Sequence, residues 1–166
     1  MEESAFAAFY DATYGGLRAY VARGAGDPAA ADDIAQEAYI RLLQAARKGT
    51  DIAATKAYLY RIATNLLIDH RRRRGREVRN ESREPAATRR EDARLDRNLD
   101  VGEAFGKLDP RQRMLLWLAH VEGYPHRDIA RIMNVGERSV RVLLFRARKR
   151  FAEALRGKDI ELEETP

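Results

Sequence analysis

Apolar residues recur every three or four positions in three segments of the first half of the chain, a spacing that predicts amphipathic α-helices. The first helix is expected over residues 4–21, and the glycines at 24 and 26 are expected to end it. The second starts at Asp27 and Pro28, an N-cap and a first-turn residue, and Gly49 follows its end. Its buried side is expected to be Ile34, Ala35, Ala38, Tyr39, Leu42 and Leu43.

The third helix of this half is long and changes character along its length. Thr55 is a candidate N-cap and Gly75 a candidate stop. Its apolar positions fall on one side, which must be buried: Tyr58, Leu59, Ile62, Ala63, Leu66 and Leu67. The helix then runs into four consecutive arginines at 71–74, which cannot lie in a core and which suit phosphate oxygens. Three helices with short connections predict an all-α bundle.

Residues 77–98 alternate charges, hold almost no large apolar side chain and include Pro85. A segment of this composition cannot bury enough apolar surface to offset its ordering entropy, so it predicts a linker. The chain is therefore expected to divide into a helical domain over 1–76, this linker, a second helical domain over 99–157 and an acidic tail over 158–166. The predicted fold class is all-α, with two helical domains joined by a flexible linker.

The second domain has the pattern of several short helices and one long one. After a helix over about 99–108, Asp109 and Gln112 are spaced as a capping box for the next helix, and Gly123 is suited to its end. A short helix over 125–134, a tight turn over 134–136 and a last helix from Glu137 to about Leu155 follow. The inward residues of that last helix are expected to be Val140, Leu144, Ala147 and Phe151. This order is the helix-turn-helix layout, in which the second, arginine-rich helix enters the major groove of DNA.

The net charge of +5 is unevenly distributed along the chain. Residues 55–76 and residues 109–150 each carry a net charge of +6, whereas the segments before, between and after them carry −3, −1 and −3. Two separate basic segments indicate two separate contacts with a polyanion. The helix-turn-helix layout favours DNA as that polyanion.

The amino-acid composition excludes several kinds of site and of cellular location. The chain has no cysteine, which excludes disulfides and thiolate metal sites and fits a reducing cytoplasm. Its longest apolar run, at 114–119, is too short to span a membrane, so a soluble, cytoplasmic protein is expected. The three histidines are scattered, and the sequence has neither a glycine-rich phosphate loop nor carboxylates at metal spacing, so no cofactor, metal or catalytic site is predicted. An enzyme acting on DNA and an ordinary helix-turn-helix regulator are the competing interpretations.

Three strings resemble the conserved motifs of one family. They are DDIAQEAYIRLLQ at 32–44, AYLYRIATNLLIDHRRRR at 57–74, and a longer segment at 108–150 that begins LDPRQRMLLWLAH and ends RARKR. Together they resemble bacterial sigma-70-type initiation factors, most closely the short extracytoplasmic-function group (group 4), which keeps only regions 2 and 4. The resemblance implies a non-enzymatic factor that binds core RNA polymerase, directs it to particular promoters and helps to open the duplex.

The resemblance also implies roles for individual residues. Core polymerase would be bound by Asp33, Gln36, Glu37 and Arg41. The −10 promoter element would be captured and opened by Thr55, Tyr58, Tyr60, Arg61, Asn65, Arg71, Arg72, Arg73 and Arg74. The −35 element would be read by Arg138, Ser139, Arg141, Val142, Phe145 and Arg146. A flipped base needs aromatic stacking beside cationic groups, which matches the residue types on the long helix, although Tyr58 is equally compatible with a core position.

Three residues depart from the family pattern. Pro125 stands where the family usually has a capping serine, and Val142 and Leu143 stand where relatives often carry small polar and basic residues. Leu143 is expected to pack in the core, whereas an exposed Val142 would touch a thymine methyl or a protein partner. Relatives are usually held inactive by an anti-sigma protein that covers their polymerase-facing surfaces, and such a partner is expected here.

Overall fold

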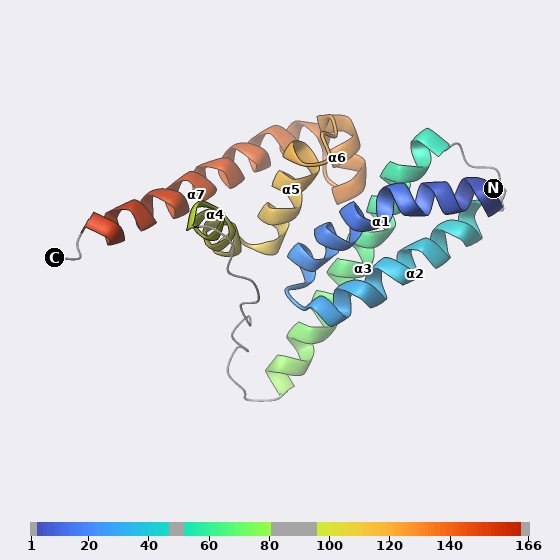
Figure 1. The fold of residues 1–166 in the computed structure, drawn as a ribbon, viewed down its shortest axis with the longest axis horizontal. Helices are drawn as coiled ribbons and strands as arrows, with labels where there is room; N and C mark the ends of the chain where they lie inside the picture. Colours follow the sequence, from blue (N-terminus) through green and yellow to red (C-terminus); the bar gives the residue numbers. More distant parts are fainter. Residues whose placement is uncertain (1–2, 47–51, 81–95, 164–166) are drawn as a thin grey trace. The chain divides into compact units, whose positions relative to one another are not determined.

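The computed structural model describes residues 3–46, 52–80 and 96–163, and within these ranges the chain forms seven α-helices and no strand (Figure 1). They are α1 (Glu3–Ala25), α2 (Pro28–Ala46), α3 (Ile52–Asn80), α4 (Asp96–Gly106), α5 (Pro110–His120), α6 (His126–Met133) and α7 (Glu137–Glu163). The chain divides into two compact units, one of which contains α1–α3 and the other α4, α5, the first part of α6 and α7. The predicted fold class, all-α with two helical domains, is confirmed.

In the first unit, α1, α2 and α3 all contact one another around a core of aliphatic and aromatic side chains. The core includes Leu17, Tyr20, Val21, Ala35, Ala38, Leu42, Leu59, Tyr60, Ala63 and Leu67. Two buried hydroxyl pairs join the helices: the oxygens of Thr13 and Tyr39 lie 2.7 Å apart, and so do those of Tyr20 and Thr64. The Thr64 hydroxyl donates to the Tyr60 carbonyl at 2.7 Å, so the Tyr20 hydroxyl is the donor of its pair. Each buried hydroxyl of these two pairs thus has a partner.

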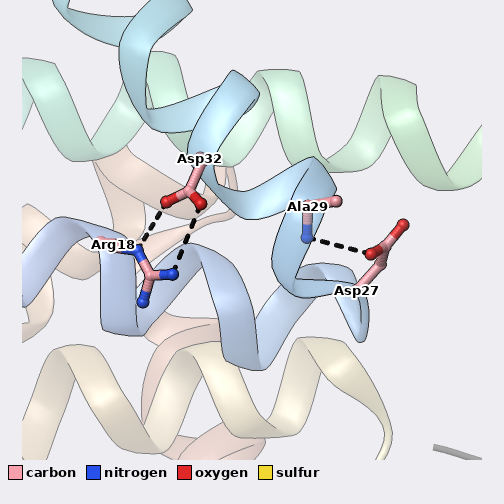
Figure 2. Close-up of polar contacts among 4 residues, drawn as sticks. All are labelled: Arg18, Asp27, Ala29 and Asp32. Carbon is pink, nitrogen blue, oxygen red and sulfur yellow. Dashed lines mark hydrogen bonds and ion pairs between the residues drawn. The ribbon is translucent and has the colours of Figure 1, made fainter.

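The corner between α1 and α2 has the capping chemistry that the sequence predicts. Gly26 adopts a left-handed φ of +68°, and Asp27 Oδ1 accepts the Ala29 N–H at 3.1 Å in the place of an N-cap. Figure 2 shows this cap beside a forked ion pair, in which Arg18 Nε donates to Asp32 Oδ1 at 2.5 Å and Arg18 Nη2 donates to Asp32 Oδ2 at 3.4 Å. The hydrogen bond from the guanidinium lowers the pKa of the Asp32 carboxyl.

In the second unit, α7 contacts α4 and α5. The capping box predicted at Asp109 is present: the Gln112 N–H donates to Asp109 Oδ1 at 2.9 Å, and the Asp109 N–H donates to Gln112 Oε1 at 3.3 Å. Gly123 adopts a φ of +70° just after α5, which is where the sequence places the helix end. Of the four residues of α7 predicted to face inward, Val140, Leu144 and Ala147 are fully buried and Phe151 is half-buried.

The turn between α6 and α7 is a tight reversal that starts at Asn134. Asn134 has a φ of +53°, and the Val135 N–H donates to the Ala130 carbonyl at 3.0 Å, as in a Schellman helix end. At the start of α6 the Pro125 carbonyl accepts the N–H groups of Asp128 and Ile129 at 3.0 and 3.1 Å. Pro125 therefore opens this helix through its main chain and supplies no side-chain acceptor, as the sequence indicated.

Several helix boundaries differ from the prediction. The third helix begins at Ile52 and ends at Asn80, so Thr55 is not its N-cap and Gly75 lies inside it. A glycine in a helix costs only about 1 kcal/mol relative to alanine, and the arginines on both sides favour helix, so Gly75 is no obligatory stop. The last helix likewise continues through the expected acidic tail to Glu163, and α4 begins at Asp96. The remainder of the predicted linker, residues 81–95, lies outside the described residues.

Candidate nucleic-acid interface

The outer side of α2 combines charged and apolar side chains. Asp33, Gln36 and Arg41 are exposed, Glu37 is half-buried, and Arg41 Nε contacts Glu37 Oε1 at 2.7 Å. All four side chains therefore lie on the surface side of the helix, where a binding partner can reach them.

Two apolar residues lie on the same side of α2. Ile40 is 50% exposed and Leu43 is 38% exposed. The prediction that Leu43 is buried is wrong, because the helix buries its opposite side through Ile34, Ala35, Ala38 and Leu42. Ile40 was not among the predicted residues, although an isoleucine one position before Arg41 and four after Gln36 could have been recognised as lying on their side. We call Asp33, Gln36, Glu37, Ile40, Arg41 and Leu43 the α2 surface.

The two predicted tyrosines of α3 lie in opposite environments. Tyr58 is 37% exposed, whereas Tyr60 is fully buried, with its ring centroid 5.1 Å from that of Tyr20. The interpretation of Tyr58 as part of the buried stripe is wrong, and Tyr60 is not available to stack on a base. Thr55, also predicted to bind the −10 element, is only 1% exposed and lies inside the helix. Of the predicted residues before the arginines, Tyr58, Arg61 and Asn65 therefore remain on the surface.

The arginines of α3 extend this outer side. Arg71, Arg72, Arg73, Arg74 and Arg76 are all exposed. Arg72 falls seven residues after Asn65 and eleven after Arg61, so it continues their side of the helix. We call Tyr58, Arg61, Asn65 and Arg72 the α3 surface.

Arg74 differs from its neighbours because it faces the α1–α2 corner. Its Nη1 lies 3.6 Å from Asp27 Oδ2, the carboxylate that also caps α2. Arg71, Arg72 and Arg73 pair with no acid among the residues that the structure describes. The positive charges of three of the four predicted arginines are therefore available to bind a polyanion. Arg74 instead joins the basic end of α3 to the α1–α2 corner through its ion pair with Asp27.

The outer side of α7 carries cations around two apolar residues. Arg138, Val142, Phe145 and Lys149 follow one another at intervals of four, three and four, so they form one line along the helix, and Arg141 and Arg146 flank it. All six side chains are exposed; Val142 is 48% and Phe145 65% exposed. Leu143 is half-buried and Ser139 is exposed in the first turn. We call the line with its two flanking arginines the α7 surface.

Arg148 lies outside this surface and is held by α5. Its Nε donates to His120 Nε2 at 3.1 Å. That contact gives Arg148 a role in joining two helices of its own unit, which the sequence did not indicate. Its charge nonetheless stays on the exposed side of the unit, next to Lys149 and Arg150.

Neither a metal site nor a membrane-spanning helix is found among the residues that the structure describes. No group of three or more His, Asp or Glu side chains there is arranged to hold a metal ion. No helix in the same ranges is both long and apolar enough to cross a membrane.

Two family models match the chain, one in each unit. Sigma-70 region 2 matches residues 9–77, which run from α1 to the arginines of α3, and sigma-70 region 4 matches residues 98–151, which run from α4 to Phe151 of α7. The chain belongs to the sigma-70 family. The α2 and α3 surfaces thus lie in its region 2, and the α7 surface lies in its region 4.

Similar sequences place the chain in the extracytoplasmic-function (ECF) group of this family. The chain is 29% identical over 147 residues to the ECF RNA polymerase sigma factor SigL of Mycobacterium tuberculosis, covering 84% of this chain and 82% of SigL. It is 30% identical over 144 residues to the ECF sigma factor SigE of Mycolicibacterium smegmatis, covering 80% of this chain and 54% of SigE. It is also 29% identical over 150 residues to the sigma-H factor of Pseudomonas aeruginosa, covering 81% and 78% of the two chains.

A solved structure has the same fold. The sigma factor RpoE of Bartonella quintana, crystallised in complex with the anti-sigma factor NepR, matches with a TM-score of 0.74. The match covers 91% of this chain and 96% of that chain at 24% sequence identity. At this identity the likeness concerns the fold.

Proposed function

We propose that this sigma factor divides promoter recognition between its two units. In this proposal the α2 surface binds core RNA polymerase, the α3 surface opens and holds the −10 element, and the α7 surface reads the −35 element. The observation that carries the proposal is that each of the two family matches contains an exposed helix side rich in arginine.

The residue types on each surface suit the assigned step. Opening a base pair costs a few kcal/mol, and an aromatic ring beside cations can recover that cost by stacking on the extruded base. Tyr58 provides the exposed ring, and Arg61 and Arg72 provide the cations. Arginines on the second helix of a helix-turn-helix suit guanine edges and phosphates in the major groove.

The α2 surface suits a protein partner better than a nucleic acid. It carries two acids and one arginine that is already paired with Glu37, so it offers no net positive charge to a polyanion. Ile40 and Leu43 add exposed apolar area at its centre. An apolar centre with charged residues around it is typical of a protein–protein interface.

We also infer that an anti-sigma protein controls this chain. The Bartonella quintana sigma factor with the same fold was crystallised in complex with such a protein. The exposed apolar residues of the α2 surface provide an area that a bound inhibitor would need to cover. Affinity purification of the chain from native cells under non-inducing conditions should recover a stoichiometric protein partner other than polymerase, and recovery of polymerase alone would contradict this part of the proposal.

The division between the units is tested by Arg141→Ala. This variant should lose transcription from the cognate promoter, while its affinity for core polymerase, measured by fluorescence anisotropy of the labelled chain, stays unchanged. Arg156→Ala is the matched control, because it removes the same charge from an exposed position of the same helix beyond the region 4 match. Loss of polymerase binding together with transcription would contradict the division.

A further inference from the structure

Val142 and Phe145 are an unusual feature of the α7 surface. They lie at the middle of the line that ends in Arg138 and Lys149, on the side opposite to Val140, Leu144 and Ala147, which fill the core. Because α7 already buries a complete apolar stripe, neither residue is needed for packing within the unit. Exposing two neighbouring apolar side chains to solvent is unfavourable in free energy, so such a pair indicates a surface that a ligand or partner covers.

The surrounding charge identifies what covers them. Between Arg138 and Arg150 the chain carries six cations and no acid. A protein partner would have to match this with a concentrated acidic surface, whereas duplex DNA presents phosphates on both sides of a groove that admits an α-helix. An apolar contact framed by cations therefore fits the major groove.

Only one base offers an apolar group in that groove. Thymine carries a C5-methyl group, whereas cytosine has hydrogen at this position and the purine edges present polar atoms. A valine side chain has no donor or acceptor, so it reads no base edge by hydrogen bonding. Its β-branch restricts χ1, which keeps its two methyl groups close to the helix and in one orientation.

We infer that Val142 selects a thymine in the −35 element by covering the C5-methyl group, with Phe145 closing the contact from the adjacent turn. This inference rests on the proposed function, because it takes α7 as the helix that reads the −35 element. It names Val142 as a specificity-determining residue and makes a thymine methyl its ligand.

The test uses deoxyuridine, which differs from thymidine by the methyl group alone. The promoter is taken from transcripts that appear when the chain is overproduced, and each thymine of its −35 element is replaced singly by deoxyuridine. Binding of the reconstituted holoenzyme to each duplex is measured by competition. One position should lose about fourfold in affinity, the value expected for one uncovered methyl group.

The same measurement on Val142→Ala assigns the contact. Holoenzyme that carries Val142→Ala should bind the unmodified promoter about fourfold or more weakly than the wild type. Deoxyuridine at the sensitive position should then lower its affinity hardly at all. Val121→Ala is the matched control, since Val121 is 59% exposed, lies just beyond α5 and is not part of the α7 surface. The control should keep the full deoxyuridine penalty.

Three results would overturn the inference. If no deoxyuridine weakens binding although replacing the whole −35 element abolishes it, the methyl contact is wrong and the proposed function stands. If Val142→Ala keeps the full penalty, another residue reads the methyl group, and a protein partner becomes the explanation for exposed Val142. If replacing the whole −35 element has no effect on holoenzyme binding, the proposed function fails and the inference fails with it.

Discussion

Tyr58 and Tyr60 provide a direct comparison, because they are the same residue type two positions apart on α3. Truncating the fully buried Tyr60 to alanine removes an aromatic ring from the core, and such a change costs about 3–5 kcal/mol. The lost ring contact with Tyr20, at a centroid distance of 5.1 Å, is included in that cost. Since whole domains are stable by only about 5–15 kcal/mol, Tyr60→Ala should leave the first unit close to unfolding.

Tyr58→Ala should have the opposite profile. Tyr58 is 37% exposed, and substitutions at such positions usually change stability by less than about 1 kcal/mol. If its ring stacks on an extruded base, the variant should bind core polymerase normally but fail to open a linear promoter. Tyr58→Phe keeps the ring and should behave like the wild type.

Two assays separate these effects. Urea unfolding followed by circular dichroism measures stability, and permanganate reactivity of thymines around the −10 element measures opening by the holoenzyme. A promoter with a pre-melted −10 segment should restore transcription by Tyr58→Ala but not by Tyr60→Ala. The reasoning is refuted if Tyr60→Ala unfolds at the wild-type urea concentration, or if Tyr58→Ala opens the linear promoter as well as the wild type does.

Three further predictions follow from the structure. Ile40→Asp should weaken binding to core polymerase about fivefold or more, as measured by anisotropy, whereas Val101→Asp, an equally exposed valine on α4, should not; equal loss in both would contradict the α2 surface. Asp109→Ala removes one side of the capping box and should lower the unfolding free energy of the second unit by about 1 kcal/mol, and an unchanged urea midpoint would argue against that cap. Burial raises the pKa of Tyr39 to about 12, so above pH 10 the unfolded chain loses a proton that the folded chain keeps, and the free energy of unfolding should fall as the pH rises from 10 towards 12; urea midpoints that do not fall over this range would contradict it.

Local chemistry was the most predictable part of the fold. The Asp109 capping box, the Asp27 cap and the left-handed Gly123 each depend on residues within a few positions of one another. The same holds for the stripe of Val140, Leu144 and Ala147, because α7 packs through one narrow side. In these cases the spacing of the residues along the chain determines which side chains and main-chain groups can contact one another.

Long-range packing decided the positions that were predicted wrongly. α3 contacts both α1 and α2, so the buried part of its circumference is wide and extends to Tyr60 and Thr64, which pack towards Tyr20. If the apolar pattern of α3 is instead interpreted as one narrow buried face, Tyr58 is predicted to face inward. Leu43 was predicted to be buried for a related reason. Its burial depends on whether a neighbouring helix packs against that part of α2, and an apolar side chain does not by itself indicate this.

The candidate site could be predicted as a set of helices but not residue by residue. Basic charge and the helix-turn-helix pattern identified α3 and α7, yet Thr55 and Tyr60 proved buried and Ile40 was missed. The ion pair between Arg74 and Asp27 joins residues 47 positions apart, and no sequence pattern indicates it. Exposure, which distinguishes a binding residue from a core residue of the same type, is a property of the whole fold.

Transcription by purified components tests the central proposal most directly. Core RNA polymerase freed of other sigma factors is incubated with the cognate promoter, with and without the full chain, and the transcript start is mapped. We predict one discrete start that depends on the chain and is lost with Arg141→Ala. Binding of the chain alone to the promoter duplex at nanomolar concentration, with no association with core polymerase and no chain-dependent transcript, would contradict the proposal.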